Sequence, residues 1–367
     1  MRPTQALIDT NKLRNNYHTI KKVTNNAEVT AIVKANSYGH GMVECAGVLQ
    51  SEGCRFFGVA IPEEAIKLRQ GGIKTDILVV YPVLPDQAYY FCKFDIQASL
   101  SNIEFAEELS NMCGKLSNKV KCHLFINTGM NRDGIQPEEA VDYMNYVSRL
   151  PGLDIIGCFT HFATSSSDLD FAREQLNIFN NTLESLKIAG HHFQWIHSAN
   201  TGAIAYLPES HFNMVRPGIA LYGGGPDIET AKMLNVEPIL TLKSKIILLR
   251  RIKEGESVGY DRMFRANKPM TIATVPIGYG DGYLKILTGK SRCIIGGKSF
   301  EIAGSVCMDE IMVNIEDSEF QIGDEVIMIG KQKKEEITIY ELAEKAGTIP
   351  YEITTALSPR ILSIYKP

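Results

Sequence analysis

The regular alternation of short apolar runs with longer amphipathic stretches, over the first two thirds of the chain, most constrains the fold. Eight runs have the length and the β-branched or aromatic content of buried strands. They are Val29 to Val33, Phe56 to Ala60, Ile77 to Val80, Phe94 to Ala98, Val120 to Ile126, Ile155 to Phe159, Phe193 to Ile196 and Asn213 to Val215. Helical patterns separate them, as at Pro62 to Gln70, Ile103 to Met112, Pro137 to Leu150 and Phe171 to Ala189. Eight such alternations predict a (β/α)8 barrel of the TIM type.

The pattern changes after Gly223-Gly224-Gly225-Pro226. Strand-like runs separated by turn residues follow, and helical signals almost vanish. The runs are Val236 to Ile252, Met270 to Ile277, Ser291 to Ile295, Ser299 to Val306, Ile311 to Ile315 and Asp324 to Ile329. We therefore expect a barrel domain over residues 1–228 and a mostly β domain over residues 229–367, with one helix near Ile339 to Lys345.

Charge and composition narrow the range of partners. The 38 Lys and Arg residues against 42 Asp and Glu give a formal charge of -4, which is no electrostatic footprint for nucleic acid or an anionic membrane. No apolar run is long enough for a signal peptide or a membrane span, so we expect a cytoplasmic protein. The eight cysteines form no C-x-x-C pair, and we interpret them as buried apolar residues, with no metal site.

In such a barrel the active site lies at the carboxyl ends of the strands, so the residues that follow each apolar run are the candidates. Cations, imidazoles and amides are frequent there. These residues are Lys34, Tyr81, Asn127 to Arg132, His161, His197, Asn200 and Arg216. The sequence predicts that they converge on one rim.

Lys34 closes an apolar strand, where we expect an ammonium to be poorly solvated. A free amine there can form an imine with the aldehyde of pyridoxal phosphate. Thr201-Gly202 and Pro217-Gly218-Ile219 offer a hydroxyl and backbone N–H groups for its phosphate. By themselves, a solvent-exposed lysine at a strand end and glycines in ordinary turns explain the same residues.

A longer set of motifs resembles the alanine racemase family. The string from Ala31 to Gly41, AIVKANSYGHG, is similar to the family's cofactor-lysine signature, and further blocks follow in the family's order along nearly the whole chain. These blocks are Thr128 to Arg132, Phe159 to Ala163, His197 to Thr201, Arg216 to Gly223, Ile277 to Gly282 and Cys307 to Asp309. The resemblance implies a barrel followed by a β domain, with residues 4 to 9 joining the latter as a strand.

The resemblance also implies a two-base mechanism. Lys34 holds pyridoxal 5′-phosphate and is one acid/base, and Tyr260 is the other. In the family this tyrosine reaches the barrel of the partner subunit, which implies a homodimer with shared active sites. An unperturbed tyrosine has a pKa near 10, so we expect His161 and Arg216 to supply the positive charge it needs.

The remaining roles are also implied by the resemblance. Arg216 faces the pyridine nitrogen and keeps it unprotonated, which weakens the electron sink. The other cofactor-binding residues are Tyr38, His161, Asn200, Thr201, Gly218 and Ile219. Arg132, Met308 and Tyr279 bind the substrate, and Lys285 and Asp309 line its entrance with Tyr279.

Some positions depart from the family's pattern. Phe125 stands where many members carry a lysine that can be carbamylated and that supports the arginine equivalent to Arg132. That support must come from elsewhere, and Asn127, which replaces a usual aspartate, is one candidate. Thr201 replaces a serine and keeps its hydroxyl. Ser358-Pro359-Arg360 replaces a tyrosine-bearing segment, which leaves the width of the pocket open.

We therefore expect racemisation of alanine, supplying the D-enantiomer for cell-wall synthesis. The nearest alternative is a serine racemase or one of broader specificity, because apolar pockets reject an added hydroxyl poorly. A barrel-type pyridoxal decarboxylase is a second alternative, against which Arg216 speaks because an acidic partner would be expected there. A non-catalytic cofactor-binding protein is the third, and Tyr260 with the β domain speaks against it.

Overall fold

The structure is a computed structural model that describes residues 2–367, and these residues form two compact units. We call Leu13–Glu237 the barrel unit, and the residues up to Lys12 together with Pro238–Pro367 the β unit. The boundary between the barrel unit and the main part of the β unit lies between Glu237 and Pro238. The domain boundary expected after residue 228 stays a prediction.

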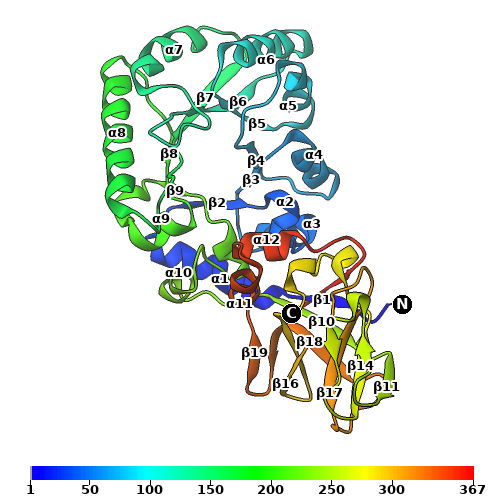
Figure 1. The fold of residues 1–367 in the computed structure, drawn as a ribbon. Helices are drawn as coiled ribbons and strands as arrows, with labels where there is room; N and C mark the ends of the chain where they lie inside the picture. The colour runs from blue at the N-terminus through cyan, green and yellow to red at the C-terminus, as the bar shows by residue number, and fades with distance from the viewer. Residues whose placement is uncertain (1) are drawn as a thin grey trace. The chain divides into compact units, whose positions relative to one another are not determined.

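Eight parallel strands close into a barrel, each pairing with the next and the last with the first, as Figure 1 shows in part. The strands are β2 (Glu28–Ile32), β3 (Phe56–Val59), β4 (Asp76–Val79), β5 (Gln97–Leu100), β6 (Val120–Phe125), β7 (Leu153–Phe159), β8 (Trp195–His197) and β9 (Met214–Val215). Every residue of β2, β3 and β5 is buried, as expected for strands that pack against side chains on both faces. The predicted barrel is confirmed.

Helices precede, separate and follow the barrel strands along the chain (Figure 1). They are α1 (Thr10–Val23), α2 (Lys34–Tyr38), α3 (Met42–Ser51), α4 (Pro62–Gln70), α5 (Ala88–Phe94), α6 (Ile103–Leu116), α7 (Ala140–Val147), α8 (Leu169–Ile188), α9 (Thr201–Tyr206) and α10 (Ile228–Leu234). Several begin at side-chain caps: Asn102 accepts from Phe105 N, and Asp168 accepts from Phe171 N.

The expected strand Phe94 to Ala98 begins too early. Phe94 is the last residue of α5, and Asp95 turns the chain with a φ of 51° before β5 starts at Gln97. The apolar run therefore contains a helix end, a turn and a strand start. Hydrophobicity alone does not separate these three, because apolar Phe94 and Ile96 flank the exposed Asp95.

The β unit contains three sheets. The largest has the order β16-β15-β18-β10-β1-β20 with β19 added on β18, and the others are β11-β14-β17 and β12-β13. Their strands are β1 (Gln5–Asp9), β10 (Leu240–Lys245), β11 (Leu248–Ile252), β12 (Ser257–Val258), β13 (Phe264–Arg265), β14 (Met270–Val275), β15 (Arg292–Ile295), β16 (Lys298–Glu301), β17 (Ile311–Glu316), β18 (Glu325–Gln332), β19 (Glu335–Ile337) and β20 (Leu362–Lys366). β1 lies between β10 and β20, so the start of the chain is part of this sheet.

Two helices, α11 (Ile339–Ala346) and α12 (Pro350–Thr355), complete the β unit. The predicted helix near Ile339 is confirmed. The expected single run from Val236 to Ile252 is wrong in one respect: it forms β10 and β11, which belong to different sheets. The chain crosses between them at Ile246 and Ile247, whose amides bond to Asp324 O and Thr274 O.

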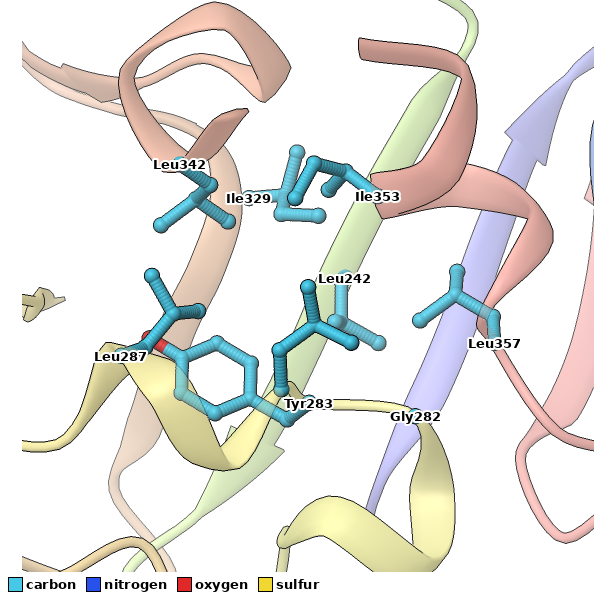
Figure 2. Close-up of a pocket in the computed structure, with 9 residues that line it drawn as sticks. Leu242, Gly282, Tyr283, Leu287, Ile329, Leu342, Ile353 and Leu357 are labelled. Carbon is cyan, nitrogen blue, oxygen red and sulfur yellow. The ribbon is translucent and has the colours of Figure 1, made fainter. Parts of the chain in front are cut away.

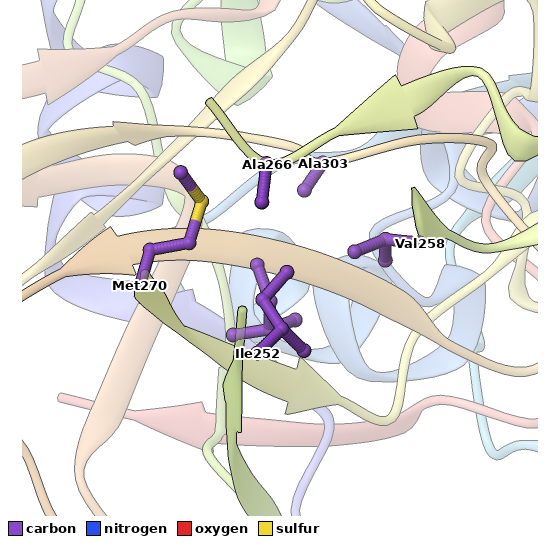
Figure 3. Close-up of a cluster of buried hydrophobic side chains, with 6 residues drawn as sticks. Ile252, Val258, Ala266, Met270 and Ala303 are labelled. Atoms are coloured by element: carbon purple, nitrogen blue, oxygen red, sulfur yellow. The ribbon is translucent and has the colours of Figure 1, made fainter. Parts of the chain in front are cut away.

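The interior of the β unit is apolar in two places. One is a buried cluster beside β11 and β14 that contains Ile252, Val258, Ala266, Met270, Ile272 and Ala303 (Figure 3). The other is a small pocket among aliphatic side chains of the main sheet, α11 and α12, with the Tyr283 ring on one side (Figure 2). None of the candidate site residues lines this pocket.

Within residues 2–367, no helix has both the length and the apolar character that crossing a membrane requires.

Candidate active site

Lys34 follows the first barrel strand and starts an unusual turn. Ala35, Asn36, Ser37 and Tyr38 all have φ between 50° and 55°, so α2 is a left-handed turn built from residues with side chains. Each such residue costs about 1–2 kcal/mol relative to the right-handed form. The turn is therefore maintained by its surroundings, as backbone strain at functional positions usually is.

The Glu64 carboxylate is one of those surroundings. Its Oε1 accepts a hydrogen bond from Ala35 N at 2.6 Å, and its Oε2 accepts one from Ala60 N at 2.8 Å. Glu64 lies in the first turn of α4, and it connects the residue after Lys34 to the residue after β3. Asn36 Oδ1 accepts from Met42 N at 3.0 Å and closes the other side of the turn.

The side chain of Tyr81, which follows β4, contacts two cations. Lys34 Nζ donates a hydrogen bond to Tyr81 Oη at 2.8 Å and lies 4.7 Å from the ring centre. The Arg132 guanidinium carbon lies 5.0 Å from the same ring centre. These contacts bring Lys34 and Arg132 to one aromatic side chain.

Arg132 is also bonded through Nε to Asp133 Oδ2 at 2.8 Å. Asn127 does not support it as expected: throughout the described chain, the Asn127 side chain bonds instead to the turn at Gly129 and Asn131 and to Gln136. An amide with acceptor and donor ends suits that turn, which needs both.

Phe125 is buried and cannot bond to Arg132. Its ring stacks on Phe159 with centres 4.3 Å apart, and Phe159 stacks on the His197 ring at 4.8 Å. The Arg216 guanidinium lies 5.2 Å from the centre of the Phe159 ring. Phe125 therefore extends an aromatic stack under Arg216.

Arg216 is buried, and all its bonds within residues 2–367 go to uncharged acceptors. Its Nη1 donates to His197 Nδ1 at 2.7 Å, and its Nη2 donates to the carbonyls of Thr160 at 2.6 Å and Ser198 at 3.0 Å. Burial lowers the pKa of Arg216 to about 9, so the guanidinium stays protonated at neutral pH. Its charge is not neutralised by any carboxylate of the described chain.

A chain of neutral side chains continues from Arg216 into the barrel. His197 Nε2 lies 2.8 Å from His123 Nδ1, and His123 Nε2 lies 3.0 Å from Gln97 Oε1. Because an arginine can only donate, His197 must accept at Nδ1, and each ring then donates from Nε2 to the next acceptor. Burial and the charge of Arg216 lower the pKa of His123 to about 3. The His123 ring therefore carries no second proton near neutral pH.

His161 is also uncharged. Its Nδ1 accepts from Arg216 Nη2 at 3.3 Å. Burial, followed by the charges of Arg216, Arg132 and Lys34, lowers its pKa to about 3. Of the two cations expected to act on Tyr260, only Arg216 therefore carries charge near neutral pH.

The loops after β8 and β9 present open hydrogen-bond donors. Asn200 caps α9 by accepting from Ala203 N at 3.1 Å, while Thr201 Oγ1 accepts from Gly218 N at 3.2 Å. The amides of Thr201, Gly202 and Ile219 have no acceptor among the described residues. Convergent backbone N–H groups of this kind suit a phosphate dianion.

Gly218 is required at this place by its neighbour Tyr38. A Cβ on Gly218 would lie 2.3 Å from Tyr38 Oη, far inside contact distance. Only glycine leaves room for the tyrosine hydroxyl beside the backbone at position 218. Tyr38, Thr201, Gly218 and Ile219, all expected around a phosphate, are thus arranged at one end of the barrel.

The other candidates belong to the β unit. Tyr260 begins a 3-10 turn after Gly259 and is 71% exposed. Tyr279 and Met308 lie on two loops joined through their backbones, since Tyr279 N bonds to Cys307 O at 3.0 Å and Gly280 N to Met308 O at 2.9 Å. Both side chains are exposed.

Ion pairs around Asp281 hold these two loops. The Asp281 side chain is fully buried and accepts from Gly278 N at 2.9 Å and from both terminal nitrogens of Arg2. Arg360 Nη2 bonds to Asp309 Oδ1 at 2.6 Å, and its Nε lies 3.5 Å from Asp281 Oδ1. Within the described residues, the backbone of Met308 is thus fixed from both sides.

Sequence reasoning did not assign roles to Glu64, Asp133, His123 or Gln97. Tyr81 was within reach, since it follows an apolar run, but a phenol at a strand end has no specific meaning by itself. Asp133 carries a local signal in its position next to Arg132. The partners of Glu64, His123 and Gln97 are distant in sequence, and only the folded barrel shows them.

The chain is similar along its whole length to known proteins. The model described as "Alanine racemase, N-terminal domain" matches residues 8–226, and "Alanine racemase, C-terminal domain" matches residues 239–365. The alanine racemase of Carboxydothermus hydrogenoformans is 38% identical over 368 residues, which is 100% of each chain. Among solved structures, the alanine racemase of Clostridium difficile 630 is 34% identical with a TM-score of 0.94, covering 100% of this chain and 96% of that one. An alanine racemase from Bacillus anthracis with bound L-Ala-P is 33% identical, with the same TM-score and coverage.

Proposed function

The chain belongs to the alanine racemase family, and from this premise we propose that it interconverts L-alanine and D-alanine with pyridoxal 5′-phosphate as cofactor. One observation carries the proposal. The Lys34 amine and the open amides of Thr201, Gly202 and Ile219 lie at the carboxyl ends of strands of one closed barrel. That end of a barrel is where active sites form.

The residues present fit the cofactor. An amine for its aldehyde and three open amides with a threonine hydroxyl for its phosphate are the groups that this molecule requires. Because Gly218 has no side chain, Tyr38 Oη lies close to the backbone at this position, and we expect its hydroxyl to contact the same phosphate. In this proposal Lys34 holds the cofactor, with Tyr38, His161, Asn200, Thr201, Arg216, Gly218 and Ile219 around it.

The chemistry that pyridoxal phosphate supplies when bound is acidification of the α-C–H bond of an amino acid. Lys34 Nζ then takes or returns the α-proton on one face. Tyr260 Oη, from the partner subunit, does the same on the other face. Two bases on opposite faces interconvert the enantiomers without either group moving around the substrate.

Arg216 controls how strongly the α-proton is acidified. Its guanidinium has donors and no acceptor, and its pKa of about 9 keeps it charged, so a ring nitrogen facing it stays unprotonated. The neutral contacts with His197, Thr160 and Ser198 hold the guanidinium in place without neutralising it. An unprotonated ring nitrogen limits side reactions and favours return of the proton to the α-carbon.

Substrate binding is the proposed role of Arg132 in the barrel unit and of Met308 and Tyr279 in the β unit. Arg132 Nη1 and Nη2 bond to no acceptor of the described chain, so both are available to a carboxylate. Met308 contributes its backbone N–H, on a loop that the Asp281 ion pairs hold. The exposure of Tyr260, Tyr279 and Met308 is compatible with contact to a second subunit, so we propose a homodimer.

In the cell we propose a cytoplasmic enzyme that supplies D-alanine for peptidoglycan. The direct test is to incubate the purified protein with L-alanine and pyridoxal phosphate and to follow D-alanine by chiral chromatography. We expect an equal mixture of the two enantiomers at equilibrium. No D-alanine, or a preference for L-serine by more than tenfold, would contradict the assignment to alanine.

Replacement of the two bases tests the mechanism. Lys34→Ala should lose the absorbance near 420 nm, and its turnover should fall at least about a thousandfold. Tyr260→Phe should keep this absorbance, and its turnover should fall by a similar factor. Lys331→Ala, an exposed lysine on β18, is the matched control and should change neither. Full turnover by Tyr260→Phe would exclude the two-base role.

A further inference from the structure

We propose that Tyr81 is a positioning residue that sets both the free Lys34 amine and the Arg132 guanidinium. The inference rests on the proposed function and concerns how this chain holds two of its functional groups. Within residues 2–367, Tyr81 is the one side chain that contacts both Lys34 Nζ and the Arg132 guanidinium through a hydrogen bond or its ring.

The two contacts use different parts of the tyrosine. Lys34 Nζ, at 2.8 Å from Oη, needs the hydroxyl. Arg132, at 5.0 Å from the ring centre, needs the aromatic face, whose negative quadrupole attracts a guanidinium. The two roles are therefore separable by substitution.

Arg132 has a specific need for such a contact in this chain. Phe125 stacks on Phe159, and Asn127 is committed to the turn at Gly129 and Asn131. What remains is the Tyr81 ring and the single bond from Nε to Asp133. One bond fixes one atom of a guanidinium, and contact with an aromatic face fixes its plane.

This arrangement also leaves the useful donors uncovered. Asp133 accepts a hydrogen bond from Arg132 Nε, and the Tyr81 ring contacts the face of the guanidinium. Nη1 and Nη2 therefore remain available to other partners. A paired hydrogen bond from these nitrogens to a carboxylate depends on the orientation of the plane. Tyr81 therefore determines affinity for the carboxylate of the substrate.

The Lys34 contact has a kinetic consequence. Lys34 acts as a base only while its amine is free, and the Tyr81 hydroxyl is the partner that then holds Nζ. Loss of the hydroxyl should slow proton transfer at Lys34 and leave transfer at Tyr260 unchanged.

The first experiment measures carboxylate binding, without turnover. Propionate, which has the carboxylate and carbon skeleton of alanine but no amine, is titrated into cofactor-loaded enzyme by calorimetry. Tyr81→Leu, which removes the ring, should raise the propionate Kd by roughly twofold to fivefold, the range of an exposed cation–π contact. Tyr81→Phe, which keeps the ring, should stay within about twofold of wild type. An unchanged Kd in Tyr81→Leu would overturn the Arg132 part of the proposal.

The second experiment compares the two alanine enantiomers with an α-deuterium label. Tyr81→Phe should raise the isotope effect on kcat/KM for the enantiomer whose proton goes to Lys34, and not for the other. An equal change for both, or none, would overturn the Lys34 part.

Two controls keep these outcomes interpretable. Tyr90→Leu, an exposed tyrosine on α5, should leave Kd and isotope effects unchanged, and Trp195 fluorescence checks that each variant is folded. If wild type does not interconvert alanine, the proposed function fails, while the propionate comparison still tests the hold of Tyr81 on Arg132.

Discussion

Arg216 of the barrel unit and the arginines Arg2 and Arg360 of the β unit are held by opposite kinds of partner. In the barrel unit Arg216 is bonded to carbonyl oxygens and neutral histidines. In the β unit Arg2 and Arg360 are paired with the carboxylates of Asp281 and Asp309. The first arrangement keeps a positive charge available to a ligand, whereas the second uses the charge to fix two loops.

The two units also differ in how their folding stability depends on pH. All eight histidines lie between Leu13 and Glu237, and none lies in the β unit. The pKa values of His40 and His123 are lowered to about 4 and 3 by burial. The unfolded chain, with histidine pKa values near 6.5, binds these protons first, so folding of the barrel unit loses stability as pH falls through that range.

The largest expected effect is therefore acid destabilisation confined to the barrel unit. Each of His40 and His123 should remove about 2 kcal/mol of unfolding free energy between pH 7 and pH 5, about 4 kcal/mol together. Trp195 is the single tryptophan and lies in β8, so its fluorescence during urea unfolding reports the barrel unit alone. Hydrogen exchange of β18 peptides reports the β unit, which should change little.

His123→Gln and exposed His192→Gln form the matched pair for this measurement. The first should reduce the pH dependence by about 2 kcal/mol, and the second should not alter it. If hydrogen exchange of β18 and the Trp195 unfolding transition responded equally to acid, the predicted difference between the units would be wrong.

A smaller effect is expected from Arg216→Met. It leaves the Thr160 and Ser198 carbonyls and His197 Nδ1 without their donor, which should cost about 3 kcal/mol of barrel stability. Arg216→Lys restores part of this, because an ammonium donates to some of the same acceptors. Urea unfolding followed by Trp195 fluorescence measures both, and a Lys variant no better than Met would argue that packing, not hydrogen bonding, dominates.

The smallest effect is expected in the β unit. Asp281→Asn keeps an acceptor for Gly278 N but removes the charge that the partly exposed Arg2 and Arg360 face, which should cost about 2 kcal/mol. Exchange of the Gly278 and Gly280 amides should accelerate, while the Trp195 transition stays unchanged. Asp317→Asn, at an exposed ion pair with Arg251, is the control and should change neither.

The sequence was sufficient for the barrel because each of its strands is an apolar run between helical patterns. It was less informative where one short apolar run contains both a helix end and a strand start, as at Phe94 to Ala98. The same holds where a strand has mixed polarity, as in β20. α12 escaped notice because six residues give too little periodicity.

For the candidate site, sequence motifs identified the residues but not how they are held. Lys34, Arg132 and Arg216 were found, whereas the contacts that orient them come from Tyr81, Asp133 and the His197–His123 pair. Those partners come from different strands, and their proximity is a property of barrel closure. Asn127, one candidate for the support of Arg132, is not bonded to it for a different reason: its local turn uses the same side chain.

The left-handed turn after Lys34 bears on the order of events during synthesis. Its geometry depends on Glu64 from the next helix, and β2 completes its pairing only with β9, the last barrel strand to leave the ribosome. A nascent chain carrying only the first strands would relax Ala35 to Tyr38 toward ordinary backbone angles. Lys34 is therefore translated early, but the turn that follows it acquires its final backbone geometry only after most of the barrel has been synthesised.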